Sequence, residues 1–420
     1  MPTRKRTDRP EVLVVGAGAA GSIAAICLAR KGLSVTLLDK NDSPARKIRV
    51  TGNGRCNLTN LYQDPACWYS GGRDFSMDLL GGFGPRDLMG FFEGMGIRFH
   101  DRDGYVYPRT DQASVIADTL AGEIRRLGIA FSGKTGVTGI LAPEKGRDGY
   151  LVFGGEKAWR GDCLILACGG MAGPAFGCRG DGYRLAASLG HSLVPPVPAL
   201  TPLPADKKRL RNAAGVRCRG NVSALVDGIP VRTEGGELQF TENTVSGIPV
   251  FQISRILTRA LEEGREAEIL LDFLPEFRKE DLEREASFRK TMPDSMTLQE
   301  VFAGLVHPGI LRMVLGDLGL QNEVKKKRIS DAVLELILKS FKDCRFPIDH
   351  MPGYDKAQTT AGGVPLHEVD AGTFMSLKRE NLYLTGELLD VDGICGGYNL
   401  QWAMTSGYLA ARSITERAAI

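Results

Sequence analysis

The hexapeptide GAGAAG at residues 16–21 has the residue types and spacing of a turn that binds a pyrophosphate. In a GxGxxG turn, Gly16 allows the sharp bend, Gly18 lets the backbone approach the phosphates, and Gly21 allows close packing of helix on strand. The free N–H groups and the dipole at the start of the helix favour the anion. Asp39 ends the next apolar run and is placed to accept hydrogen bonds from a ribose hydroxyl. The spacing therefore predicts a dinucleotide site.

A second glycine-rich turn lies near the C-terminus. Residues 382–385 predict a strand, and Gly386, Gly393 and the sequence GGYN at 396–399 follow it. A helix that starts near Leu400 would present a second N-terminus to a flavin edge or to a phosphate. The hexapeptide alone does not separate FAD from NAD(P). A C-terminal segment that returns to the first site is typical of two-domain flavoproteins, so we expect FAD.

The decapeptide TGNGRCNLTN at residues 51–60 combines glycines with polar side chains. Its glycines let backbone amides approach a flat ring or a diphosphate. Arg55 would place a positive charge where a reduced flavin becomes anionic, which would favour reduction. The alternative is a polar turn network without a ligand.

Several single residues are candidates for cofactor binding, and each also has an ordinary structural explanation. Lys47 would bind phosphate or lie in solvent, and the backbone at Val137 would pair with an adenine. One carboxylate among Glu387, Asp390 and Asp392 would bind a ribityl hydroxyl or act as a structural cap.

Tyr398 and Asn399 would contact the ring system or donate a proton. With Arg55 they are the predicted catalytic residues, and no metal site is predicted. The predicted cofactor-binding residues are Gly16, Ala17, Gly18, Ala19, Ala20, Gly21, Asp39, Lys40, Lys47, Thr51, Gly52, Asn53, Gly54, Arg55, Cys56, Asn57, Val137, Cys168, Gly169, Gly170, Gly386, Glu387, Asp392, Gly393, Gly397, Tyr398, Asn399 and Leu400.

The composition restricts the classes of partner. The 420 residues include 53 Lys and Arg against 50 Asp and Glu, and a net charge of +3 argues against a nucleic-acid or anionic-membrane partner. The nine Cys include no CxxC pair, so we expect neither a disulfide framework nor a zinc site, and a cytoplasmic location. Residues 12–29 carry no charge, but the glycine turn inside them predicts a strand and a helix rather than a membrane span. We expect Met1–Pro10 to be disordered.

The elements that position the first turn form a β-α-β unit. Residues 11–15 and 33–38 predict strands on either side of a helix at 22–31, which implies a parallel sheet. The apolar run 163–167 predicts a further buried strand.

The composition and the pattern of predicted elements change after His191. The proline-rich residues 192–204 predict a linker, and 215–250 predict short antiparallel strands with turns at 227–228 and 235–236. Residues 251–343 predict amphipathic helices. We therefore expect a domain made from both chain ends, with an insertion between them.

These motifs together resemble the BaiN/YhiN-like family of bacterial FAD-dependent oxidoreductases, some of which are described as aminoacetone oxidases. The resemblance follows the chain in order through GAGAAG, Lys47, TGNGRCNLTN, Cys168–Gly170, Gly177–Tyr183, Thr360–Val364, Gly386–Gly393 and Gly396–Trp402. It implies non-covalent FAD in a Rossmann-like α/β domain of the two-dinucleotide-binding flavoprotein type. The expected division is 1–191 and 348–420 for the FAD-binding domain, with a β-barrel-like and helical substrate domain inserted at 192–347.

The chain departs from the family pattern at three places. The usual TGG turn reads Cys168-Gly-Gly, the usual Thr before GGYN is Cys395, and the usual Gly-Ser-Thr-Gly reads Gly-Cys178-Arg179-Gly. These changes put in doubt that this chain shares the substrate of its relatives. Small apolar replacement is the ordinary explanation for the thiols.

The resemblance implies NAD(P)H-dependent reduction of an activated C=C bond in an oxo-steroid, a bile-acid-like compound or a similar hydrophobic small molecule. No second GxGxxG turn is visible, so NAD(P)H would dock transiently at the flavin. The alternative is an FAD-dependent amine oxidase that uses oxygen. A flavin-bearing RNA-modification protein is a third class, which the net charge disfavours. The oligomeric state is not predicted.

Overall fold

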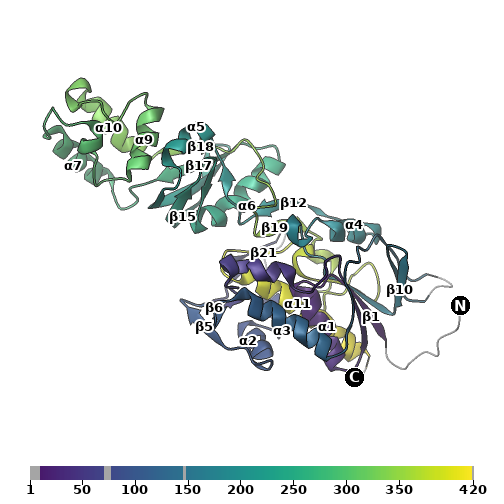
Figure 1. Ribbon diagram of the computed structural model, residues 1–420. Helices are drawn as coiled ribbons and strands as arrows, with labels where there is room; N and C mark the ends of the chain where they lie inside the picture. The colour runs from purple at the N-terminus through teal and green to yellow at the C-terminus, as the bar shows by residue number, and fades with distance from the viewer. Residues whose placement is uncertain (1–9, 71–76, 145–147, 419–420) are drawn as a thin grey trace. The chain divides into compact units, whose positions relative to one another are not determined.

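The computed structural model describes residues 10–70, 77–144 and 148–418, and the chain divides into two compact units (Figure 1). Unit 1 comprises Met1–Pro196 and Gln358–Ile420, and unit 2 comprises Val197–Ala357. The chain thus leaves unit 1 five residues after the boundary that the sequence suggests, and it re-enters unit 1 ten residues after the second boundary. The expected disorder of Met1–Pro10 concerns residues that, apart from Pro10, lie outside the described part of the chain.

Unit 1 is built on a parallel sheet with the strand order β20-β11-β1-β2-β7. The strands are β1 (Glu11–Val15), β2 (Ser34–Leu38), β7 (Ala130–Ser132), β11 (Cys163–Leu166) and β20 (Leu382–Leu384). β11 and β20 are buried at every position, as expected for apolar strands covered on both faces. The expected parallel sheet and β-α-β unit are confirmed, and β20 comes from the C-terminal part of the chain.

Three helices lie side by side against this sheet (Figure 1). They are α1 (Ala19–Arg30), α3 (Ala113–Arg126) and α11 (Tyr398–Arg417). α1 and α11 approach closely, since a Cβ at Gly407 would lie 2.3 Å from the carbonyl oxygen of Ala20. On α3, hydrogen bonds from Arg126 and Arg30 lower the pKa of Glu123 to about 2 and tie α3 to α1.

Smaller elements surround the central sheet of unit 1. The helices are α2 (Pro85–Glu93) and α4 (Asp181–Ser188). The strands are β3 (Thr59–Asn60), β4 (Trp68–Tyr69), β5 (Phe99–Arg102), β6 (Tyr105–Pro108), β8 (Gly139–Leu141), β9 (Tyr150–Gly154), β10 (Lys157–Gly161), β19 (Thr359–Gly363) and β21 (Asp392–Gly393). β6 pairs with both β3 and β5, and β21 pairs with β4.

Unit 2 contains an antiparallel sheet with the order β13-β16-β15-β14-β17-β18. Its strands are β13 (Leu203–Pro204), β14 (Arg217–Val226), β15 (Ile229–Phe240), β16 (Thr244–Ser246), β17 (Ala267–Asp272) and β18 (Cys344–Pro347). Its helices are α5 (Lys207–Leu210), α6 (Ile248–Glu262), α7 (Lys279–Lys290), α8 (Leu298–Val301), α9 (Pro308–Asp317) and α10 (Asp331–Ser340). One apolar core joins the sheet to the helices.

The structure corrects three expectations for the insertion. The dipeptide at 235–236 is not a turn but lies inside β15, where Gly235 faces Asn221 and a Cβ would meet its side-chain oxygen at 2.7 Å. β17 interrupts the stretch predicted as helical, and its alternating burial is the period of a strand. The proline-rich linker region contains β12 (Val194–Ala199) and β13, since proline is tolerated at sheet edges.

The helices of the described residues are too short or too polar to cross a membrane. The apolar run near the N-terminus is divided between β1 and α1, as the glycine turn predicts.

Candidate functional site

The turn between β1 and α1 contains two kinds of glycine. A Cβ at Gly16 would lie 2.3 Å from the carbonyl oxygen of Ala167, and one at Gly21 would lie 1.8 Å from that of Gly16, so both glycines are needed for packing. A Cβ at Gly18 would meet no heavy atom of the described residues within 4 Å. Gly18 is also the N-cap of α1 and has no side-chain cap bond. The start of α1 therefore faces open space with its backbone amides, as an anion site requires.

Asp39 stabilises this turn from the end of β2. Its Oδ2 accepts a hydrogen bond from the backbone N–H of Ala17 at 2.6 Å, and its Oδ1 accepts from the backbone and side chain of Asn41 at 2.7 and 2.9 Å. A carboxylate has further lone pairs, so these bonds leave capacity for a ribose hydroxyl. The neighbouring Lys40 forms an ion pair with Asp181 at the start of α4.

Lys47, Gly170 and Glu387 come together from three distant segments. Lys47 Nζ lies 3.0 Å from Glu387 Oε2, and Glu387 Oε1 accepts from the backbone N–H of Thr360 at 2.8 Å. A Cβ at Gly170 would collide with Thr360 Oγ1 at 2.5 Å. Burial opposes the charge of Lys47, but the charge of Glu387, the proximity of Cys178 and the hydrogen bond to Glu387 outweigh it and leave the lysine pKa raised.

Thr360 belongs to the motif Thr360–Val364 that carries the family resemblance, but it was not among the predicted site residues. Its Oγ1 accepts hydrogen bonds from the backbone N–H groups of Met171 and Ala172 at 2.9 and 3.1 Å. It thus holds the loop after β11, which includes the predicted Gly169 and Gly170, against β19. Its position in the sequence TTAGG, in a segment with no charged residue, was the available signal.

The segment Thr51–Arg55 turns outward with an unusual backbone. Gly52, Asn53 and Gly54 have φ angles of 55°, 54° and 81°, in the left-handed region, and all three are exposed. A Cβ at Gly54 would meet no heavy atom of the described chain within 4 Å. Arg55 is exposed as well, so the segment presents backbone amides and one cation to its surroundings.

The following residues anchor that segment to β6. Cys56 is buried, and the backbone N–H of Leu58 donates to the carbonyl oxygen of Val106 at 2.9 Å. The side-chain amide of Asn57, in the orientation that satisfies both of its ends, donates to the carbonyl oxygens of Thr59 and Val106.

The predicted proton donors at the start of α11 are committed to internal contacts. Tyr398 is 2% exposed, donates its hydroxyl to the carbonyl oxygen of Tyr62 at 3.0 Å and packs edge-on against Trp68. Burial, followed by the nearby Cys67, raises its pKa far above the usual range. The Asn399 amide bonds both the N–H and the carbonyl of Gly393 at 2.9 Å. Both side chains shape the turn, and a direct chemical role for them stays a prediction.

The remaining predicted residues lie around these contacts. Asp392 is 1% exposed in β21, and Leu400 is partly buried. Gly397 caps α11 with a φ of 91° directly against Thr59, where a Cβ would lie 2.7 Å from the backbone. Val137 precedes β8 instead of lying within a strand, and it is half-buried.

The three cysteines that depart from the family pattern form no disulfide with another cysteine of the described residues. Burial raises the pKa of Cys168 to about 12 and that of Cys395 to about 11, and it also raises the pKa of Cys178. These thiols are therefore protonated at neutral pH and behave as small, weakly polar side chains.

Two further tyrosines stand beside this site. Tyr105 and Tyr107 share one face of β6 and are half-buried, while Val106 between them faces the interior. Tyr105 lies against the turn before α11, because a Cβ at Gly396 would come within 2.9 Å of its ring. The ring of Tyr107 stacks on His100, with centroids 5.8 Å apart. The alternation of Y-V-Y was the sequence signal for a shared face.

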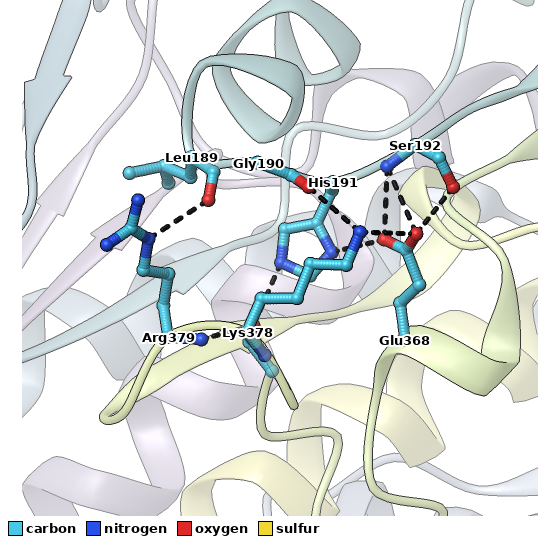
Figure 2. Close-up of polar contacts among 8 residues, drawn as sticks. Leu189, Gly190, His191, Ser192, Glu368, Lys378 and Arg379 are labelled. Carbon is cyan, nitrogen blue, oxygen red and sulfur yellow. Dashed lines mark hydrogen bonds and ion pairs between the residues drawn. The ribbon is translucent and has the colours of Figure 1, made fainter.

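A second polar cluster, the His191 cluster, joins the end of α4 to residues 368–379 (Figure 2). Glu368 Oε2 lies 2.7 Å from His191 Nδ1, and His191 Nε2 lies 2.9 Å from Ser376 Oγ. Lys378 Nζ bonds both Glu368 Oε1 at 2.6 Å and the carbonyl oxygen of Gly190 at 2.9 Å. Ser192 also donates to the Glu368 carboxylate from its N–H and its hydroxyl.

The charge states of the His191 cluster follow from these bonds. Burial opposes ionisation of Glu368, but hydrogen bonds from Lys378, Ser192 and His191 outweigh it and lower its pKa to about 2. Burial lowers the pKa of His191 despite the carboxylate. Because an ionised Glu368 only accepts, His191 is neutral with its proton on Nδ1, and Nε2 accepts from Ser376.

The fold and the candidate site together define a flavoprotein with a Rossmann-type FAD-binding domain, and the chain is an oxidoreductase enzyme. The chain belongs to the family described as HI0933-like protein Rossmann domain, which matches residues 10–413. The residues fit the cofactor, since Gly18 and Gly54 leave open space beside backbone amides at two turns.

Among similar proteins is the 3-dehydro-bile acid delta(4,6)-reductase of Clostridium scindens, which is 38% identical over 96% of this chain and 98% of its own length. The ribosomal RNA dihydrouridine synthase of Escherichia coli is 30% identical over 97% of this chain and 98% of its own length. Among solved structures, 3-ketosteroid delta1-dehydrogenase from Sterolibacterium denitrificans covers 98% of this chain and 100% of its own, with a TM-score of 0.50 at 14% identity. This last likeness supports the fold.

Proposed function

We propose that this protein is an FAD-dependent reductase of a C=C bond conjugated to a carbonyl group, in an oxo-steroid or bile-acid-like substrate, with NAD(P)H as the electron donor. The observation that carries the proposal is the 38% identity to a 3-dehydro-bile acid delta(4,6)-reductase over nearly the whole of both chains. The substrate is then a small hydrophobic molecule.

When bound, FAD would supply the hydride chemistry. The start of α1 and the open side of Gly18 would bind the pyrophosphate, and Asp39 would bind a ribose hydroxyl. Lys47 would lie near the diphosphate or ribityl chain with Glu387 as its partner. Arg55 would place a positive charge beside the ring system. A proton must also be delivered to the carbon next to the one that receives hydride.

Anaerobic flavin reduction tests the electron donor. The purified holoenzyme, mixed with NADPH or NADH without oxygen, should lose its flavin absorbance, and a steroid with a 3-oxo-4-ene or 4,6-diene group should restore it. An enzyme that is bleached by an amine and by neither nicotinamide would instead be an amine oxidase, and the proposal would fail.

A second candidate is supported by the two ribosomal RNA dihydrouridine synthases, at 30% and 29% identity. Dihydrouridine lacks the C=C bond of uridine, which is conjugated to a carbonyl, so the same reaction class serves a different substrate. The net charge of +3 argues against a large RNA partner. Incubation with NADPH and unmodified ribosomal RNA, followed by mass spectrometry of the nucleosides, separates the two: dihydrouridine formation, together with inactivity toward steroids, would favour the RNA substrate.

A further inference from the structure

Two large apolar side chains of unit 1 are exposed next to each other, directly after β3. Leu61 is 46% exposed and Tyr62 is 62% exposed. A single exposed apolar side chain is common on a protein surface, whereas adjacent ones beside a binding site indicate a contact surface. Whether the Leu61–Tyr62 pair is such a surface depends on how firmly its backbone is held and on what it borders.

The backbone of the Leu61–Tyr62 pair is held by three hydrogen bonds. The N–H of Leu61 donates to the carbonyl oxygen of Gly104 at 2.8 Å, and the N–H of Tyr62 donates to Asn60 Oδ1 at 2.9 Å. The Tyr398 hydroxyl donates to the carbonyl oxygen of Tyr62 at 3.0 Å. Asn60 and Tyr398 are themselves buried. The two exposed side chains therefore stand on a fixed backbone.

The residues just before the pair contact the glycine turn 393–397, which leads into α11. A Cβ at Gly397 would lie 2.7 Å from the backbone of Thr59. The side-chain amide of Asn60 donates to the carbonyl oxygen of Gly396 at 3.3 Å. β3 is thus packed directly on the end of this turn.

The residues that follow the pair return to the same turn. The N–H of Ile394 donates to the carbonyl oxygen of Cys67 at 2.9 Å, and β4 pairs with β21. A Cβ at Gly393 would lie 3.3 Å from the ring of Trp68. The chain therefore contacts the turn on both sides of the Leu61–Tyr62 pair, and the pair borders the turn.

The turn 393–397 presents the start of α11 to a ligand. Gly397 is the N-cap and has no side-chain cap bond, and the first bond within the helix is donated by the N–H of Gln401. The N–H groups before it have no partner inside the helix, so they favour an electron-rich edge of a flavin. A substrate that receives hydride must lie against that ring, and its remaining surface then reaches the side chains that border the turn.

We propose that Leu61 and Tyr62 form the surface that contacts the apolar rings of the substrate while its conjugated C=C bond lies at the cofactor. The inference rests on the proposed function and assigns the selection of a fused-ring substrate to these two side chains. An aromatic and a branched aliphatic side chain suit the flat apolar face of fused rings, and removal of both surfaces from water provides the attraction. The pair determines specificity and takes no part in the chemical step.

The test compares enones that share the reacting group and differ in the number of rings, namely 2-cyclohexen-1-one, a two-ring enone and a four-ring 3-oxo-4-ene steroid. Each reoxidises the dithionite-reduced holoenzyme in a stopped-flow experiment, which gives a half-saturating concentration and a maximal rate without NAD(P)H. In the double variant Leu61→Ser with Tyr62→Ser, the half-saturating concentration of the steroid should rise by about 10-fold or more, the usual effect of losing one large apolar contact. The maximal rate and the values for 2-cyclohexen-1-one should stay within about threefold of wild type, because the chemical step is untouched.

Leu377→Ser is the matched control. Leu377 is 63% exposed in unit 1, and its N–H bonds the carbonyl oxygen of Glu368 in the His191 cluster, so this variant should behave as wild type toward every enone. Tyr62→Phe keeps the apolar ring and should retain wild-type affinity for the steroid. The flavin content and absorption spectrum of each variant report that the fold and the cofactor site are intact.

Two results would overturn the assignment while leaving the proposed function intact. One is an unchanged half-saturating concentration of the steroid in the double variant, and the other is an equal rise for the one-ring and four-ring enones, which would mean that the pair serves the fold or the cofactor. Failure of every enone to reoxidise the wild-type enzyme would overturn the proposed function, and the assignment with it.

Discussion

The His191 cluster and the outward segment Thr51–Arg55 are both polar regions of unit 1, but they differ in where their polar groups point. In the His191 cluster, a histidine, a serine and a glutamate are bonded in series, an order also found in hydrolases. Ser376 is 3% exposed, however, and its Oγ already accepts from the backbone N–H groups of Lys378 and Arg379 at 3.0 Å. The polar groups of the His191 cluster thus bond mainly one another (Figure 2).

Thr51–Arg55 has the opposite character. Its backbone is left-handed and exposed at Gly52, Asn53 and Gly54, and a Cβ at Gly54 would meet no heavy atom of the described residues within 4 Å. Polar groups that bond one another hold the fold together, and polar groups that face open space are available to a ligand.

Breaking the closed cluster should have the largest effect. Glu368→Ala removes the acceptor of His191, Ser192 and Lys378, and a buried donor left without an acceptor typically costs about 1–3 kcal/mol. Thermal or urea unfolding should show this loss, with FAD affinity of the folded protein unchanged. Glu368→Gln keeps the shape and should lose less. An unaltered unfolding curve for Glu368→Ala would mean that the cluster does not stabilise the fold.

A larger side chain at Gly18, on the open side of the first glycine turn, should weaken FAD binding without destabilising the fold. Gly18→Val places a side chain where no described protein atom lies, and overpacking typically costs about 1–3 kcal/mol, or about 5- to 150-fold in FAD affinity. Fluorescence titration of the apoprotein measures the affinity. Gly21→Val is the contrasting control, since its Cβ would overlap the Gly16 carbonyl and should impair folding itself. Wild-type FAD affinity in Gly18→Val would contradict the placement of the pyrophosphate.

The closed cluster also predicts how stability depends on pH. His191 has a lowered pKa in the folded protein, so below its ordinary value of 6.5 the unfolded chain binds a proton that the folded chain does not. Glu368 adds to this, because its contribution is present above 4.5 and is lost as the pH falls toward about 2. Stability should therefore decline from pH 7 downward. In His191→Gln the decline between pH 7 and 5 should be shallower, and an equal slope would show that His191 is not its source.

The smallest effect is expected at Arg55, in the exposed segment Thr51–Arg55. Arg55→Gln removes a charge that is exposed to solvent, where such interactions are worth up to about 1 kcal/mol, so enone reduction should slow by about fivefold or less. Arg55→Lys should recover most of the rate. Stopped-flow reoxidation measures both, and a rate of Arg55→Gln above that of wild type would show that the charge opposes the reaction.

The sequence was sufficient for the central sheet and the first turn, because both depend on local patterns. β11 is a short, fully apolar run, β1 is apolar after Glu11, and the spacing of Gly16, Gly18 and Gly21 has one common structural use. The contact between Lys47 and Glu387 was not predictable as a pair, since the partners are far apart in the chain and no local pattern joins them.

The insertion and the surroundings of Tyr398 were harder to predict for the same physical reason. Gly235 and Gly236 carry the residue type of a turn, but a close approach of β14 and β15 also needs glycine, and only the pairing partner decides between the two. Tyr398 was selected because it stands next to a glycine turn. Whether a phenol is buried against a carbonyl or left open depends on tertiary packing that neither neighbour encodes.

The strand β20 and the helix α11 have a consequence for how the protein is made. Both come from residues after unit 2, yet β20 pairs with β11 and α11 packs on α1, so the sheet and both glycine turns are assembled across the longest separations in the chain. Unit 2 is continuous in the chain, whereas the sheet of unit 1 is complete only when β20 has paired with the edge of β11. FAD binding at the two glycine turns would therefore follow the synthesis of β20 and α11, after unit 2 has been made.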